Sequence, residues 1–123
     1  DTHALYWYEA ASPQLGAAAM VAMRAGTTPL VVSAASIWEM AIGLARGRWP
    51  EVAPFFPDVA GRLRRKGCRV IGIDAALAER SARLPWLHAD PVDRLLVATA
   101  RIEGLTLVTG DGHIRRYGVP WLW

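Results

Sequence analysis

Short, mostly apolar segments alternate with longer helical segments, and this alternation constrains the fold of the 123-residue chain more than any other feature. Residues 30–32, 69–73, 105–108 and 119–122 each read as a short strand. Apolar strands of this kind are typical of parallel sheets that are covered on both faces, and helices between them supply the crossovers. The sequence therefore predicts an α/β fold, a three-layer α/β/α sandwich with a central, mainly parallel sheet of four to five strands.

Capping residues set the boundaries of the expected helices. Ser12 before Pro13 and Asp90 before Pro91 each read as an N-cap with proline at the first helical position, and Gly104 ends the helix that Pro91 opens. The helices expected from these signals and from apolar periodicity span residues 4–11, 13–24, 34–45, 57–65, 75–84 and 91–103, with a short turn at 112–116.

Composition indicates one globular domain over residues 1–123. The chain is 53% hydrophobic and 20% charged, which is enough apolar material for one core. It has no uncharged apolar run long enough to span a membrane, and its single cysteine, Cys68, suits a reducing compartment, so we expect a cytoplasmic protein. Fourteen basic residues against eleven acidic ones give a net charge of +3, a sign that suits a polyanionic partner.

Five acidic residues stand where expected strands end or expected helices begin: Asp1, Glu39, Asp90, Asp93 and Asp111. Ligands bind at the carboxyl edge of parallel strands, so acids that are scattered in the sequence can converge there. Clustered carboxylates repel one another unless a cation neutralises them. The pattern favours a divalent metal site, although Asp111, between two glycines, is also an ordinary turn residue when it is taken alone.

Each acid also has a purely structural interpretation. Glu39 completes a capping box with Ser36, but Ser33 is an equally good N-cap and would place Glu39 in the second helical turn. Asp90 reads as a helix cap or as a group that supports the metal ligands, and Asp93, at the third helical position, reads as a ligand. If Asp1 belongs to the site, a strand directly before it is the natural support, so we expect a few apolar residues upstream in the native protein.

Four ordered segments together resemble the PIN domain, and specifically the VapC toxins of bacterial type II toxin–antitoxin pairs. They are Asp-Thr-His-Ala-Leu at 1–5, Ser-Ala-Ala-Ser-Ile-Trp-Glu-Met-Ala-Ile at 33–42, His-Ala-Asp-Pro-Val-Asp-Arg-Leu-Leu-Val-Ala-Thr-Ala at 88–100 and Leu-Thr-Leu-Val-Thr-Gly-Asp at 105–111. The resemblance implies an Mg²⁺- or Mn²⁺-dependent endoribonuclease that a small cognate antitoxin inhibits and that forms a homodimer. The catalytic acids of the family map onto Asp1, Glu39, Asp93 and Asp111. Relatives commonly carry a lysine where this chain has Gly43.

The resemblance also implies a mechanism, in which water activated by one or two divalent cations attacks an RNA phosphodiester in line. We expect hydroxyl groups to orient water or phosphate, arginines to hold the RNA backbone and histidines to border the site. The residues assigned to these supporting roles are Thr109, Ser33, His3, His88, Arg94, Arg46 and Arg48.

Three other functions compete with the nuclease. A non-catalytic PIN-like module that binds RNA or protein would share the fold and lack a complete site. A receiver-type phosphoacceptor requires a lysine on a late strand, and the only lysine is Lys66, in a basic loop. A phosphohydrolase of Asp-x-Asp type is disfavoured because His3 stands where the second acid belongs.

Overall fold

The computed structural model describes all 123 residues. It contains seven α-helices, one 3₁₀-helix and four strands. In chain order they are α1 (Thr2–Glu9), α2 (Ala17–Arg24), β1 (Val31–Ser33), α3 (Ala34–Ala45), η1 (Pro50–Phe55), α4 (Val59–Arg65), β2 (Arg69–Ile71), α5 (Ala75–Ala82), α6 (Pro91–Glu103), β3 (Leu107–Val108), α7 (Gly112–Arg115) and β4 (Trp121–Leu122).

The strands form two separate parallel pairs. Strand β1 pairs with β2, and β3 pairs with β4. The predicted α/β composition, the four strand positions and the parallel direction are therefore confirmed. The predicted central sheet of four to five strands is not formed by residues 1–123, because nothing in this range joins β1 to β3.

A groove of about 500 Å³ lies between the two strand pairs, where a continuous central sheet was predicted. Its walls include β1 on one side and β3 on the other, together with residues of α1, α2 and α6. The terminal amine of Asp1 is buried beside it and donates a hydrogen bond to the carbonyl oxygen of Val108. The strand predicted upstream of Asp1 would precede the residues that the structure describes.

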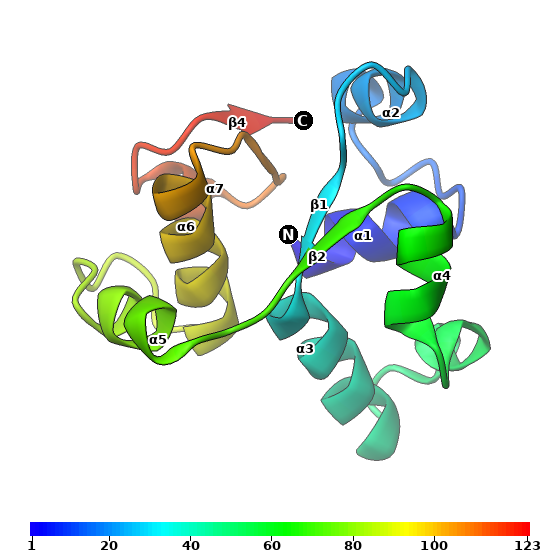
Figure 1. Ribbon diagram of the computed structural model, residues 1–123, viewed down its shortest axis with the longest axis horizontal. Coiled ribbons are helices and arrows are strands. Elements are labelled where there is room, and N and C mark those ends of the chain that lie inside the picture. The colour runs from blue at the N-terminus through cyan, green and yellow to red at the C-terminus, as the bar shows by residue number, and fades with distance from the viewer.

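Helices lie on both sides of the β1–β2 pair, with α4 on one side and α5 and α6 on the other (Figure 1). Each side has its own apolar core. The first core includes Leu5, Val32, Met40, Val52, Val59, Leu63 and Cys68. The second includes Leu77, Leu84, Val97, Ala98, Ala100, Ile114, Tyr117 and Val119.

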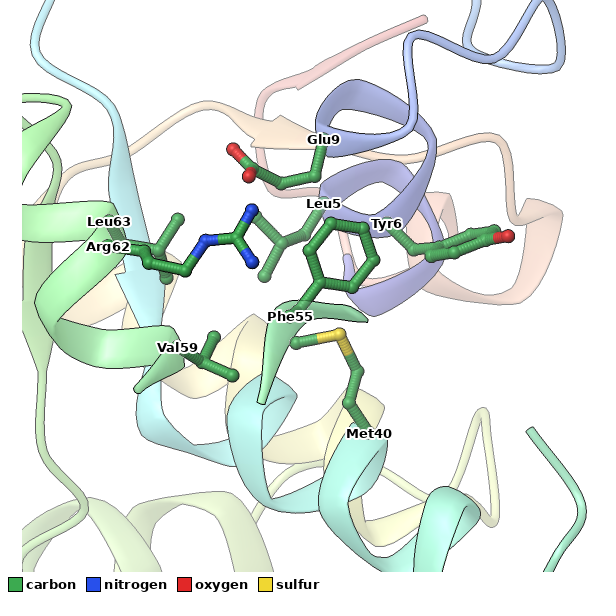
Figure 2. Close-up of a pocket in the computed structure, with 8 residues that line it drawn as sticks. All are labelled: Leu5, Tyr6, Glu9, Met40, Phe55, Val59, Arg62 and Leu63. Carbon is green, nitrogen blue, oxygen red and sulfur yellow. The ribbon is translucent and has the colours of Figure 1, made fainter. Parts of the chain in front are cut away.

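The first core is closely packed. Figure 2 shows the side chains of Leu5, Phe55 and Val59 converging on a space of only about 10 Å³, barely enough for one water molecule. The guanidinium of Arg62 lies 5.2 Å from the centre of the Phe55 ring and covers it from the solvent side. This pocket therefore belongs to the core and offers no room for a ligand.

None of the helices combines the length and apolarity that a bilayer crossing requires.

Most of the predicted caps are confirmed, and α2 is the exception. Asp90 caps α6 as predicted, and Ser33, one of the two caps considered, caps α3. Asp74 caps α5, and Gly104 ends α6 in the left-handed conformation, with φ of 63°. The helix predicted to start at Pro13 begins only at Ala17, with Gly16 as its N-cap and without a side-chain cap. The 3₁₀-helix η1 was not among the expected helices.

The late start of α2 coincides with a close contact to the end of the chain. A Cβ added at Gly16 would collide with Trp123, and one added at Gly110 would lie 2.9 Å from its ring. The Trp123 ring also packs edge-on against Trp7, with ring centres 5.6 Å apart. Trp123 thus wedges between the start of α2 and the turn that follows β3.

Candidate metal centre

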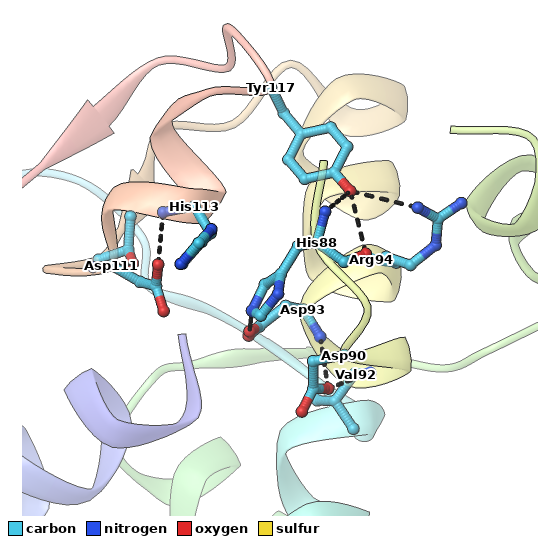
Figure 3. Close-up of polar contacts among 9 residues, drawn as sticks. His88, Asp90, Val92, Asp93, Arg94, Asp111, His113 and Tyr117 are labelled. Atoms are coloured by element: carbon cyan, nitrogen blue, oxygen red, sulfur yellow. Dashed lines mark hydrogen bonds and ion pairs between the residues drawn. The ribbon is translucent and has the colours of Figure 1, made fainter. Parts of the chain in front are cut away.

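Three side chains from separate parts of the chain meet at one point. Asp93 lies in the first turn of α6, His88 in the loop before it, and Asp111 after β3. One donor atom from each of these residues lies within 4.8 Å of the others. His88 Nε2 is 2.8 Å from Asp93 Oδ2 (Figure 3).

The start of α6 determines where the Asp93 side chain points. Asp90 caps the helix, and its Oδ1 accepts hydrogen bonds from the backbone N–H of Val92 at 2.8 Å and of Asp93 at 3.3 Å. With Pro91 at the first helical position, Asp93 falls in the first turn, next to the strand ends. The prediction that Asp90 serves as the cap is confirmed.

Thr109 shapes the turn that carries Asp111. Its Oγ1 accepts a hydrogen bond from the Asp111 N–H at 3.0 Å, and Asp111 Oδ1 caps α7 by accepting from the His113 N–H at 2.6 Å. Thr109 is completely buried. It cannot orient water or phosphate, so the role predicted for its hydroxyl is wrong, and its function is to hold Asp111.

Glu39 and Asp1 approach the site through two helices that are bonded to each other. Ser33 caps α3 by accepting from the Ala35 N–H at 3.2 Å, which places Glu39 in the second turn and rules out the capping box. Ser36 instead accepts a hydrogen bond from buried Thr2 at 3.0 Å. Because Ser33 is itself buried as a cap, the predicted contact between its hydroxyl and the substrate is also wrong.

Asp1 has a structural role in addition to its place beside the site. Its Oδ1 caps α1 by accepting from the Ala4 N–H at 2.7 Å. Burial lowers the pKa of the terminal amine to about 5, and the negative charges of Asp93 and Glu39 act in the opposite direction. The terminal amine of Asp1 therefore lies within electrostatic range of Glu39 and Asp93, although only Asp93 belongs to the tight group with His88 and Asp111.

The surroundings of Asp93 disfavour the ionised form of its carboxyl group. Burial raises its pKa first, and the neighbouring charges of Asp90 and Glu39 raise it further. The contact with His88 lowers it and only partly offsets these effects. A carboxylate with this surrounding is stabilised in its ionised form by a bound cation.

Arg94 does not reach the site. It is only 4% exposed, and its guanidinium donates a hydrogen bond to the Tyr117 hydroxyl (Figure 3). It also donates to backbone carbonyl oxygens. The carbonyl acceptors are those of Ser81, Ala82, Leu84 and Pro85. The prediction that Arg94 holds an RNA backbone is therefore wrong, because both terminal nitrogens of the buried guanidinium donate hydrogen bonds inside the protein.

The position of His88 in the tight group was underestimated from the sequence. His88 was expected only to border the site, yet it contacts Asp93 directly. Its backbone N–H donates to Tyr117 Oη at 3.0 Å, and its ring stacks on His113 at 5.0 Å. The sequence signal for this contact was the position of His88, which lies five residues before Asp93 and just before the start of the helix. His3, by contrast, is exposed and stacks on Trp49, outside the tight group.

The donor set fits a divalent cation. Two carboxylates supply the hard oxygen ligands that Mg²⁺ and Mn²⁺ prefer. The imidazole of His88 can add a nitrogen ligand or can orient Asp93 by a hydrogen bond, as partners of metal-bound carboxylates commonly do. Glu39 adds negative charge near Asp93, and the terminal amine of Asp1 lies within electrostatic range of both.

Comparisons with known proteins agree with this arrangement. Residues 1–120 match the family model of the PIN domain, and the chain belongs to this family. Over 121 residues it is 32% identical to Ribonuclease VapC22 of Mycobacterium tuberculosis (strain ATCC 25618 / H37Rv), an alignment that covers 98% of this chain and 91% of the relative. No solved structure gives a significant match.

Proposed function

We propose that this protein is a metal-dependent endoribonuclease, a VapC-like toxin that hydrolyses RNA phosphodiester bonds. The observation that carries the proposal is the convergence of Asp93, Asp111 and His88, with Glu39 and Asp1 within electrostatic range. The similarity to a protein named as a VapC ribonuclease supports the same reaction. An active site of this kind needs no side-chain nucleophile.

Asp93 and Asp111 are the residues that would hold the cation, which is Mg²⁺ or Mn²⁺ in this proposal. A bound divalent cation supplies positive charge for the phosphate and lowers the pKa of water. His88 keeps Asp93 oriented, while Thr109 fixes the turn of Asp111. Glu39 and Asp1 complete the acidic rim, which repels a phosphate unless the cation is present.

The proposal includes a small cognate antitoxin, of VapB type, that inhibits the enzyme, and a homodimer in the cytoplasm. Three tryptophans remain exposed in the single chain, namely Trp38, Trp86 and Trp121, with exposed fractions of 56%, 78% and 46%. Exposed aromatic residues are common in protein interfaces. The free, buried thiol of Cys68 is compatible with a reducing cytoplasm.

Cleavage of single-stranded RNA with Mg²⁺ or Mn²⁺, and with EDTA, tests the reaction. We expect chelation to abolish cleavage and Asp93→Asn to lower kcat at least about 100-fold, since the carboxylate is replaced by a poor ligand. Asp58→Asn is the matched control, because Asp58 is an exposed helix cap that Asn can replace.

The outcomes separate the candidate functions. Cleavage that persists both in EDTA and in the Asp93→Asn variant would exclude the metal mechanism. A protein that binds RNA and gains thermal stability from Mn²⁺, but never cleaves, would instead be the non-catalytic binding module.

A further inference from the structure

A second, polar pocket adjoins the metal centre at Glu39. It has a volume of about 360 Å³ and lies at the C-terminal half of α3 and the turn that follows. The residues that line it are His3, Glu39, Ile42, Gly43, Arg46, Arg48 and Trp49. Apart from Glu39, none of these residues belongs to the metal centre, although the sequence predicted that His3 borders the site and that Arg46 and Arg48 hold the RNA backbone.

One wall of this pocket is a pair of stacked rings. The His3 and Trp49 rings lie 4.9 Å apart at an angle of 26°. Trp49 is fixed from behind, because its Cβ lies 3.0 Å from the position that a Cβ at Gly43 would take, and Tyr6 packs edge-on at 5.3 Å. His3 is exposed. The stack therefore presents a flat aromatic surface to solvent, next to Glu39.

Two arginines contribute positive charge to the pocket. Arg46 and Arg48 flank Gly47, which turns the chain after α3 with φ of 65°. Both are exposed, and neither side chain takes part in any ion pair or hydrogen bond of the folded chain. A positive residue at a helix C-terminus also compensates the helix dipole. That effect accounts for Arg46 alone, and not for a second unpaired guanidinium beside an aromatic stack.

We propose that this pocket binds one nucleotide of single-stranded RNA adjacent to the phosphate that is cleaved. Arg46 and Arg48 contact its phosphate, since guanidinium groups match phosphate oxygens in geometry. The base stacks on the His3–Trp49 pair, as unpaired RNA bases do on aromatic side chains including histidine. The inference rests on the proposed function, because it takes RNA to be the substrate of the neighbouring centre.

RNA fits this pocket better than an acidic peptide does. An acidic peptide would also pair with the arginines, but it would bring carboxylates against Glu39 and leave the aromatic surface unused. A nucleotide uses both walls. Its phosphate group can approach Glu39 once a cation occupies the acidic centre, which couples the two sites.

Binding is measured by fluorescence anisotropy with a 5′-labelled single-stranded RNA decamer in Ca²⁺ instead of Mg²⁺ or Mn²⁺, so that a cation with oxygen ligands occupies the acidic centre. A gel run on the same samples verifies that the RNA stays intact. We expect the Arg46→Gln/Arg48→Gln variant to weaken binding about tenfold or more. We also expect it to reduce the slope of log K against log salt by about 0.7, the change that corresponds to one lost phosphate contact on a single strand. His3→Ala should weaken binding roughly fivefold through lost stacking.

Arg24→Gln is the matched control. Arg24 ends α2, at the opposite end of the molecule from the last turn of α3, is exposed and forms no ion pair (Figure 1). Its loss should change binding less than twofold. A double variant that binds with the affinity and salt slope of Arg24→Gln overturns the proposal. A wild-type protein that binds no RNA also overturns it, as does one in which the pocket captures only an acidic peptide.

The two proposals fail in different ways. If RNA binds with the expected dependence on Arg46, Arg48 and His3 but is not cleaved with Mg²⁺ or Mn²⁺, the pocket stands and the nuclease function fails. If RNA is cleaved while these variants keep the KM and the affinity of the wild type, the nuclease function stands and the pocket fails.

Discussion

At the scale of single residues, the groups around Asp93 determine how readily its carboxyl group ionises. It is partly buried, pairs with His88 and lies near two other acids, Asp90 and Glu39. Burial, and then the charges of Asp90 and Glu39, hold its pKa above the ordinary value of 3.8, although the contact with His88 lowers it. In the metal-free protein, ionising Asp93 therefore reduces stability as the pH rises from 3.8 through the raised pKa, because the folded state holds the proton more tightly than the unfolded state does.

Asp90→Asn tests this balance. Metal binding requires the ionised carboxylate, so we expect the affinity for Mn²⁺ to increase as the pH rises through the raised pKa of Asp93. Asparagine still caps α6 but removes one negative neighbour. The midpoint of this increase should move to lower pH in the variant, as measured by isothermal titration calorimetry at several pH values. An unchanged midpoint, or one at higher pH, would contradict the assignment.

The sequence predicted the acids of the site better than their surroundings. Asp93 and Asp111 were predictable because Asp93 lies in the first turn of a helix and Asp111 lies between a strand end and a helix start, and ligands bind at the ends of the strands in this fold class. Arg94 and Thr109 were given wrong roles because burial depends on tertiary packing, which residue type does not reveal. His88 was underestimated for a similar reason, since a loop side chain can point in many directions.

At the scale of elements, Arg94 acts as a clamp. It extends from α6 to the carbonyl oxygens at the end of α5 and in the loop that follows, and it also contacts Tyr117 after α7. The Trp86 ring covers the guanidinium at 4.2 Å. This clamp holds the loop that leads to His88 in one conformation.

Arg94→Met should lower the free energy of unfolding by about 3 kcal/mol, because it leaves several buried carbonyl groups without donors. For a chain of this size the melting temperature should fall by roughly 10 °C, which circular dichroism can measure. Arg83→Met is the control, since Arg83 forms only an exposed pair with Glu79 at 3.6 Å and should contribute less than about 1 kcal/mol. Equal melting temperatures for the two variants would refute the clamp.

Local signals predicted most elements. Side chains such as Ser33, Asp74 and Asp90 bond to the backbone of their own helix, so a cap can be recognised without knowledge of the fold. The start of α2 could not be recognised in this way. Its boundary coincides with a contact between Gly16 and Trp123, which are distant in the sequence.

At the scale of the whole molecule, two apolar cores face each other across the groove between β1 and β3. The number and direction of the strands were predictable from apolar runs separated by helices. Their assembly into one sheet was not, because the order of strands depends on what lies between β1 and β3. In the described residues that place is a groove.

A strand-forming extension should therefore stabilise the protein. We expect Val-Val-Ile-Val added before Asp1 to pair with β1 and β3 and to raise the melting temperature by roughly 5 °C or more, through burial of apolar surface. A Gly-Ser-Gly-Ser extension is the matched control, because it has the same length and little tendency to form a strand. If both extensions give the same melting temperature, the groove does not accept a strand.

Trp123 packs against both Gly16 and Gly110, two positions that are far apart in the sequence. A side chain at Gly16 must displace the tryptophan, and the tryptophan in turn presses on Gly110, one residue before Asp111. In a random mutagenesis screen, the inactive variants should thus include substitutions at Gly16 as well as substitutions of the acidic residues themselves. A map of such variants along the chain would mark the beginning of α2 as sensitive, although that helix contributes no ligand.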